Sequence, residues 1–241
     1  MEKFLEWTKT SFDNVEFGKL VRFAKHYDEL NDNEKQPFVS GLESEIKENL
    51  IILDMNGILI SRQFVGNKLE KDIAQFEKFE EASRVGSFLV WKRPHLDNFL
   101  DFIFKHFHVA VWSSISSYNL KLFAKHVFGD RMKDLLFMMD NTYCVKSKHP
   151  ETDEKPLFSK PLQTVWDKYD MFSSQNTVIL DDTKLKMSCN PEGTYVCPPE
   201  WSHLDENDDN FMSYGKLMNW AKHAVIIDTT LNEFNLNQTF V

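Results

Sequence analysis

The sequence lacks an excess of basic residues and any paired cysteines. Its 241 residues include 28 Lys and Arg against 37 Asp and Glu, which gives a net charge of −9. Because affinity for nucleic-acid backbones comes mostly from clustered Lys and Arg, this balance argues against nucleic acid as the main partner. The three cysteines form no Cys-x-x-Cys pair, so neither a disulfide framework nor a zinc knuckle is indicated.

Long apolar runs are also missing. No window approaches the roughly 18 consecutive apolar residues of a membrane span, and the first residues match neither a secretory nor a transit peptide. We therefore expect a cytoplasmic or nuclear protein that does not bind membranes. Gly and Pro, at eight each, are too scarce for a fibrous or linker-rich chain, whereas a hydrophobic fraction of 42% can supply a full core.

Three short apolar runs, at 50–53, 108–112 and 177–180, predict strands buried on both faces. Helical patterns over 96–106 and 161–169 precede the second and third runs, and another over 118–128 stops at Gly129. This alternation predicts an α/β fold with an open, mostly parallel, Rossmann-like sheet and helices on both faces. Weaker strand candidates are 135–139, 195–197 and 224–227.

The chain is expected to have three parts. They are a helical N-terminal extension over 1–46, the α/β domain over 47–228 and a C-terminal tail over 229–241. The extension could bind a partner or cover the sheet. The charged stretch between 61 and 91 forms a small insertion after the first strand, either a lid that shapes specificity or a surface helix. The oligomeric state is not indicated.

Polar side chains follow each of the three predicted strands. They are Asp54 and Asn56 after the first, Ser113 and Ser114 after the second, and Asp181 and Asp182 after the third, with Lys160 at the start of a predicted helix. The carboxyl ends of parallel strands meet in one crevice, so we expect these groups together. Carboxylates, a hydroxyl and a Lys suit phosphoryl transfer to a carboxylate nucleophile, with Mg²⁺ on neighbouring oxygens. Each residue alone is more often a turn former or helix cap.

The same residues lie in motifs that resemble the haloacid dehalogenase superfamily. Within it, the chain resembles the branch of carboxy-terminal-domain phosphatases and their small relatives, which carry an NLI-interacting-factor-like domain. The matching stretches are ILDMNGILI at 52–60, KRPHLDNFLDF at 92–102, VAVWSSIS at 109–116, FSKPL at 158–162 and VILDDT at 178–183 with Asn190-Pro191. The resemblance covers about 48 to 224, and the DxNGxL form resembles one subgroup. It implies a haloacid dehalogenase-like fold and a phosphorylated protein or peptide as substrate.

The resemblance also implies roles for individual residues. Asp54 would be the nucleophile that becomes an aspartyl phosphate, and Ser113, with Ser114 beside it, would bind the phosphoryl group. Lys160 would neutralise the nucleophile and the phosphate. Arg93 either contacts phosphate or anchors the structure, and the second role is favoured because Arg-Pro starts a helix away from the strand ends.

A Mg²⁺ ion is implied as the cofactor. Its ligands would be Asp54, the backbone carbonyl of Asn56, Asp181 and Asp182, directly or through water. In the closest relatives Asn often occupies the position of Asp182, so this chain adds a formal charge there.

Asn56 departs from the phosphatase pattern, in which Asp at this position protonates the leaving alkoxide. An amide cannot do so, which removes general acid help typically worth about 10²- to 10⁴-fold. Ile58 also replaces the usual Thr. Dehalogenating members of the superfamily lack this second Asp too, so covalent chemistry is not excluded. Two hypotheses follow: a weakened Mg²⁺-dependent phosphatase, or an inactive pseudo-phosphatase that binds proteins.

Overall fold

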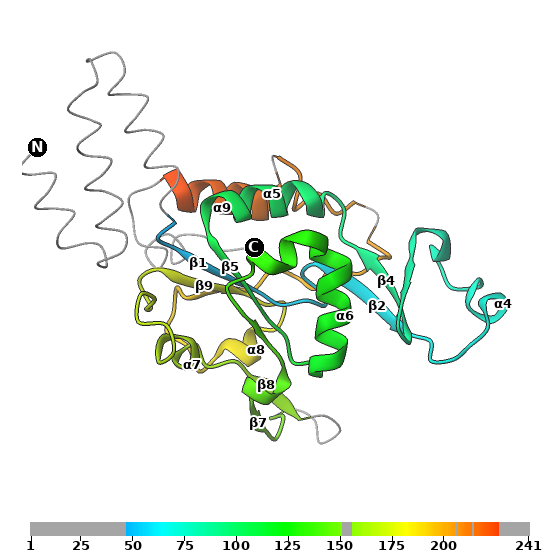
Figure 1. Ribbon diagram of the computed structural model, residues 1–241, viewed down its shortest axis with the longest axis horizontal. Helices are drawn as coiled ribbons and strands as arrows, with labels where there is room; N and C mark the ends of the chain where they lie inside the picture. The colour runs from blue at the N-terminus through cyan, green and yellow to red at the C-terminus, as the bar shows by residue number, and fades with distance from the viewer. Residues whose placement is uncertain (1–46, 151–155, 206, 214, 227–241) are drawn as a thin grey trace, which may run out of the picture. The chain divides into compact units, whose positions relative to one another are not determined.

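A five-stranded sheet forms the centre of the computed structural model, which describes residues 47–150, 156–205, 207–213 and 215–226 (Figure 1). The strand order is β10-β9-β1-β5-β6, and every neighbouring pair is parallel. The strands are β1 (Leu50–Leu53), β5 (His108–Trp112), β6 (Met138–Met139), β9 (Thr177–Leu180) and β10 (Tyr195–Val196). The predicted α/β fold class is therefore confirmed.

Helices cover both faces of this sheet. Side chains of a strand point alternately to opposite faces, so Ile51 and Leu53 belong to one apolar cluster, and Leu50 and Ile52 to another. Figure 1 shows α5 and α9 on one side and α7 and α8 on the other. The helices are α5 (Leu96–His106), α6 (Ser117–Phe128), α7 (Gln163–Trp166), α8 (Lys184–Met187) and α9 (Lys216–Ile226). Burial on both faces explains why the strands are continuously apolar.

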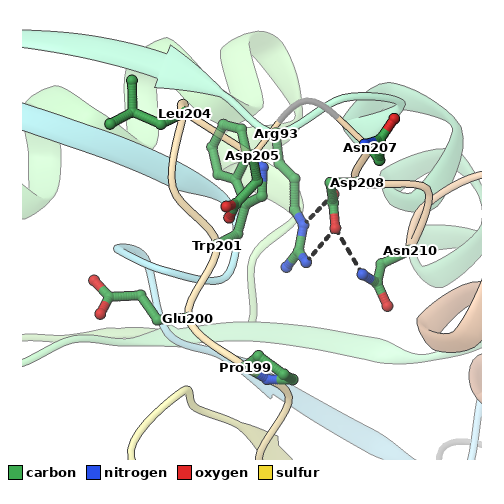
Figure 2. A pocket seen from close by; sticks show the side chains of 9 residues that line it. All are labelled: Arg93, Pro199, Glu200, Trp201, Leu204, Asp205, Asn207, Asp208 and Asn210. Carbon is green, nitrogen blue, oxygen red and sulfur yellow. Dashed lines mark hydrogen bonds and ion pairs between the residues drawn. The ribbon is translucent and has the colours of Figure 1, made fainter.

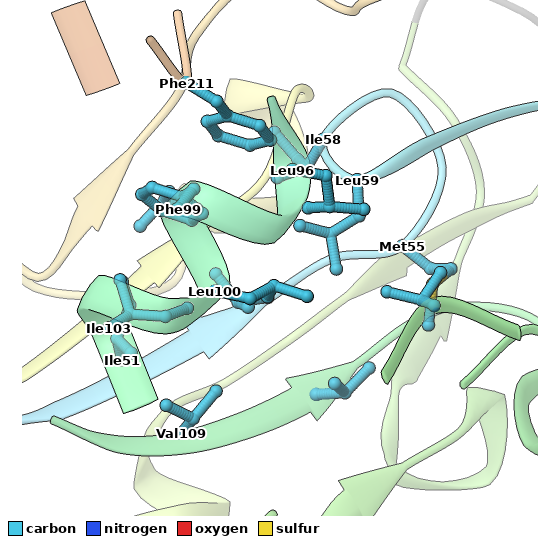
Figure 3. Close-up of a cluster of buried hydrophobic side chains, with 14 of the residues drawn as sticks. Ile51, Met55, Ile58, Leu59, Leu96, Phe99, Leu100, Ile103, Val109 and Phe211 are labelled. Atoms are coloured by element: carbon cyan, nitrogen blue, oxygen red, sulfur yellow. The ribbon is translucent and has the colours of Figure 1, made fainter. Parts of the chain in front are cut away.

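The larger apolar cluster also holds the loop that follows β1. Figure 3 shows side chains of this loop beside those of α5 and Phe211; the loop residues are Met55, Ile58 and Leu59. Phe99 of α5 is fully buried and stacks on Phe211 with 4.2 Å between ring centroids. The backbone on both sides of Asn56 is therefore anchored by the hydrophobic core.

The insertion after β1 is an antiparallel sheet, so the alternative of a surface helix does not hold. Its strand order is β2-β4-β3, and the helices between are single turns. The elements are β2 (Ile60–Phe64), α4 (Glu70–Ile73), η1 (Phe79–Glu81), β3 (Ser83–Val85) and β4 (Phe88–Lys92). Gly66 and Gly86 have φ of 57° and 58°, conformations that Gly adopts without steric cost. A role as a lid stays a prediction.

The remaining elements are short. They are η2 (Gly129–Asp134), η3 (Asn141–Tyr143), and a two-stranded sheet of β7 (Val145–Ser147) and β8 (Leu157–Ser159). In the described part of the chain, no helix is long and apolar enough to cross a membrane.

Several predicted elements differ from the structure. The helix predicted over 161–169 is reduced to α7, and the strand predicted over 224–227 is wrong, since 224–226 complete α9. Leu217, Trp220 and Ala221 of the same helix are buried at helical spacing. The expectations for 1–46 and 229–241 lie outside the described residues.

Replacing Phe99 with Ala should lower the free energy of unfolding by about 3–5 kcal/mol, because it leaves a cavity in the core and removes the stack on Phe211. Urea denaturation measures this change. Phe64→Ala is the matched control: that side chain is 63% exposed, and we expect a cost below about 1 kcal/mol. Equal costs for the two variants would contradict the assignment of Phe99 to the core.

Candidate active site

Two carboxylates meet where the central strands β1 and β9 end. Leu53 pairs with Leu180, so Asp54 and Asp181 leave the sheet side by side, and the backbone N–H of Asp54 donates to the carbonyl of Leu180 at 2.9 Å. After β1 the chain forms β5 and β6 on one side of that strand and then β9 and β10 on its other side. Such a switch point is where open α/β sheets bind ligands.

Asp182 completes a group of three carboxylates. One oxygen from each of Asp54, Asp181 and Asp182 lies within 4.8 Å of the others. Hydrogen bonds orient two of them, because Asp181 Oδ1 accepts from the Thr183 N–H at 2.9 Å and Asp182 Oδ1 accepts from the Thr183 hydroxyl at 2.9 Å. Oxygen donors of this kind are what Mg²⁺ prefers, so the residues present fit a divalent cation.

Lys160 is completely buried beside these carboxylates. Its Nζ lies 2.5 Å from Asp181 Oδ2 and 3.0 Å from Asp54 Oδ2. Burial lowers the pKa of this ammonium group, but the charges of Asp54 and Asp181 outweigh burial and raise the pKa above its usual value. Lys160 therefore stays protonated and balances part of the negative charge, as the resemblance implies.

A second lysine, Lys186, reaches the same group and was missed by the sequence reasoning. Its Nζ lies 3.5 Å from Asp54 Oδ2, 3.3 Å from Asp181 Oδ1 and 3.4 Å from Asp182 Oδ1. Burial lowers its pKa, but these three carboxylates outweigh burial and raise the pKa above the usual range. The sequence does hold a signal for this contact: Lys186 follows Asp182 by four residues, a spacing that brings side chains together on a helical turn.

The loop after Asp54 approaches Asp182 closely. Gly57 has φ of +80°, and a Cβ atom there would lie 2.3 Å from Asp182 Oδ2. The Asn56 amide donates to Glu200 Oε1 at 3.5 Å, and this exposed carboxylate was not picked out from the sequence. Glu200 belongs to a loop far along the chain, so only the fold places it beside Asn56.

Ser113 and Ser114 follow β5, which lies directly beside β1. Ser113 is buried, and its N–H donates to the carbonyl of Met139 at 3.0 Å, while Ser114 is half-buried. The sheet thus ends in Asp54, Ser113 and Asp181 on three adjacent strands, as predicted from the apolar runs.

Arg93 is occupied elsewhere. Its Nε and Nη2 donate to the carboxylate of Asp208 at 2.7 and 2.8 Å, and its Nη1 donates to the carbonyl of Ile58 at 3.1 Å. Its guanidinium carbon lies 4.9 Å from the centre of the Phe211 ring. Of the two roles considered for Arg93, these contacts support the structural one, because both ends of the guanidinium are engaged.

A cleft of about 570 Å³ lies beside this ion pair and reaches Glu200, the hydrogen-bond partner of Asn56 (Figure 2). Its polar lining is mostly acidic or amide, and Glu200 connects it to Asn56. The lining residues are Arg93, Pro199, Glu200, Trp201, Leu204, Asp205, Asn207, Asp208 and Asn210.

A parallel sheet with acidic residues and a buried Lys at its carboxyl edge fits the haloacid dehalogenase type that the sequence motifs resemble. Residues 49–228 match the model of one family, described as NLI interacting factor-like phosphatase. The chain belongs to this family. The prediction of the phosphatase branch is confirmed, whereas the DxNGxL subgroup stays a prediction.

Individual relatives share part of the chain. An uncharacterized FCP1 homology domain-containing protein of Schizosaccharomyces pombe is 32% identical over 150 residues, covering 59% of this chain and 57% of that protein. Ubiquitin-like domain-containing CTD phosphatase 1 of Drosophila melanogaster is 27% identical over 120 residues, covering 48% and 37%. The solved structure of Fcp1, an RNA polymerase II CTD phosphatase, gives a TM-score of 0.46 at 12% identity over 84% of this chain and 55% of that one. The chain thus spans less than two thirds of each.

Asp208→Asn should destabilise the protein by about 3 kcal/mol at pH 7, because it leaves the Arg93 guanidinium buried without its partner. Burial raises the pKa of the Asp208 carboxyl, but hydrogen bonds from Arg93 and Asn210 outweigh burial, so the pKa lies below its ordinary value. In the unfolded chain the pKa of an Asp carboxyl is near 3.9, so the lower pKa in the folded protein stabilises the fold above that pH. This stabilisation is lost as the pH falls through the pKa of the folded protein.

The difference in the free energy of unfolding between the unaltered protein and Asp208→Asn should therefore shrink below about pH 4. Urea denaturation of both at pH 7 and pH 3 measures it. A difference that is the same at both pH values would contradict the buried ion pair.

Proposed function

We propose that this chain is a Mg²⁺-dependent phosphatase that works through an aspartyl phosphate on Asp54. The observation that carries the proposal is the position of Asp54, at the end of the central strand and 3.0 Å from the buried Lys160 ammonium. Family membership supports a phosphatase over a binding module. The alternative of a pseudo-phosphatase rests on Asn56 and is an outcome of the test below.

In the first step an oxygen of Asp54 attacks the phosphorus of a phosphomonoester. A bond forms between phosphorus and the carboxylate oxygen, and the bond to the ester oxygen breaks with both electrons going to the leaving oxygen. The Lys160 ammonium would place positive charge beside the phosphoryl group, and the Ser113 hydroxyl would donate to it, as the resemblance implies. In the second step water attacks this phosphorus, and the bond to the Asp54 oxygen breaks with both electrons returning to the carboxylate. Inorganic phosphate leaves, and a proton of the water passes through solvent to the leaving oxygen of the first step.

The acidic group at the sheet edge would hold the metal ion. Asp54, Asp181 and Asp182 supply carboxylate oxygens, and the backbone carbonyl of Asn56 is the further ligand implied by the resemblance. A bound Mg²⁺ would supply charge neutralisation for the phosphoryl oxygens.

Asn56 restricts the range of good substrates. Its amide donates a hydrogen bond toward Glu200 but cannot protonate a leaving alkoxide. Esters whose leaving group departs without a proton should therefore turn over better than alkyl esters. By analogy with the CTD phosphatases among its relatives, we propose phosphoserine or phosphothreonine in a protein as the substrate. A cytoplasmic or nuclear location stays a prediction.

The test is hydrolysis of an aryl phosphate with and without Mg²⁺, by the full chain and by Asp54→Asn and Asn56→Asp. The unaltered chain should turn over slowly and only with Mg²⁺, and Asp54→Asn should lower the rate by at least about 10³-fold. Asn56→Asp should raise the rate on an alkyl phosphate by about 10²- to 10⁴-fold, and less on the aryl ester.

Asp72→Asn is the matched control, because Asp72 is an exposed carboxylate in the insertion. Circular dichroism confirms that each variant folds. Activity that survives Asp54→Asn would exclude Asp54 as the nucleophile. If neither the unaltered chain nor Asn56→Asp hydrolyses the ester, the chain is a binding module, and phosphopeptide binding becomes the measurement.

A further inference from the structure

Lys186 contacts more of the carboxylate group than Lys160 does. Lys160 forms ion pairs with Asp54 and Asp181, whereas Lys186 also reaches Asp182. The Lys186 ammonium therefore lies within 3.5 Å of an oxygen from each of the three residues that could hold a metal ion.

An ammonium in that position and a divalent cation on the same carboxylates exclude each other. Mg²⁺ binds oxygen at about 2.0–2.1 Å, so an ion shared by the three carboxylates would lie only a few ångströms from Nζ. Positive charges at that separation, largely shielded from water, repel each other strongly. Both cations would also draw on the same negative charge, since Asp54 Oδ2 already faces the two lysines.

Of the two lysines, Lys186 is the one that can withdraw. Lys160 is completely buried, so moving it would leave an ammonium unpaired in the core. The Lys186 side chain is 19% exposed and lies on the single-turn helix α8 at the surface of the site. Its four-carbon stem lets the ammonium swing toward water while the backbone stays in place. That backbone is fixed, since the Lys186 N–H donates to Thr183 and its carbonyl accepts from the Lys160 N–H.

We propose that Lys186 is an internal competitor of the divalent cation and sets the metal affinity of this site. Metal binding exchanges the Lys186 ammonium for the ion on Asp54, Asp181 and Asp182. The site then fills at a higher free metal concentration than three carboxylates and one lysine would require. This inference rests on the metal site of the proposed function.

The experiment is isothermal titration calorimetry of the full chain with Mg²⁺, repeated with Mn²⁺ and followed by electron paramagnetic resonance. Lys186→Met removes the competing charge and should tighten metal binding at least tenfold. Lys186→Arg keeps the charge and should leave the Kd within threefold of the unaltered protein. Both readouts measure binding and need no turnover.

Lys184→Met is the matched control, because Lys184 is an exposed lysine on the same helix. It should change the Kd by less than threefold, which separates a contact effect from a change of net charge. Thermal melting checks each fold, and Lys186→Gln replaces Lys186→Met if the latter does not fold.

A Kd for Lys186→Met that is unchanged or weaker would overturn the competition while leaving the metal site intact. Equal tightening by Lys184→Met would also overturn it, since a general charge effect would then suffice. If no variant binds Mg²⁺ or Mn²⁺, both the competition and the metal site of the proposed function are wrong.

Discussion

The mutual repulsion of Asp54, Asp181 and Asp182 is the constraint on which the rest of the site depends. Three carboxylates with oxygens within 4.8 Å of one another need nearby positive charge, because like charges at this distance repel each other. Lys160 and Lys186 supply it. The dependence is mutual, since a completely buried ammonium such as Lys160 would be very costly without carboxylate partners. The carboxylates at the strand ends and the buried lysine therefore stabilise each other, and the same carboxylates give the site its capacity to bind a metal ion.

The fold holds these charges together with apolar packing that lies outside the site. The β1–β9 register sets Asp54 beside Asp181, and fully buried side chains on both sides of Asn56 anchor the following loop. Gly57 then lets the loop pass Asp182 where a Cβ atom would lie 2.3 Å from the carboxylate oxygen. A hydrophobic cluster thus fixes the position of polar groups that would otherwise separate.

The sequence predicts features that arise from neighbouring residues better than features that arise from contacts between distant parts of the chain. Strands buried on both faces leave short continuous apolar runs, so β1, β5, β9 and the polar residues after them were predicted, as was the α5 range. The antiparallel insertion was not, because its strands β2 and β3 are half-exposed and interrupted by charge. Lys186 and Glu200 were missed because their roles arise only when a helical turn and a distant loop reach the site.

Asn56 and Asp182 are best understood together. The resemblance implies Asp at the first position and often Asn at the second, so this chain exchanges the two and keeps the number of carboxylates. By that resemblance, the exchange removes the side chain that would protonate the leaving group and adds a charge beside Asp181. Lys186 lies 3.4 Å from that added charge, whereas the Asn56 amide faces Glu200. Lys186 therefore offsets part of the negative charge that Asp182 contributes to the carboxylate group.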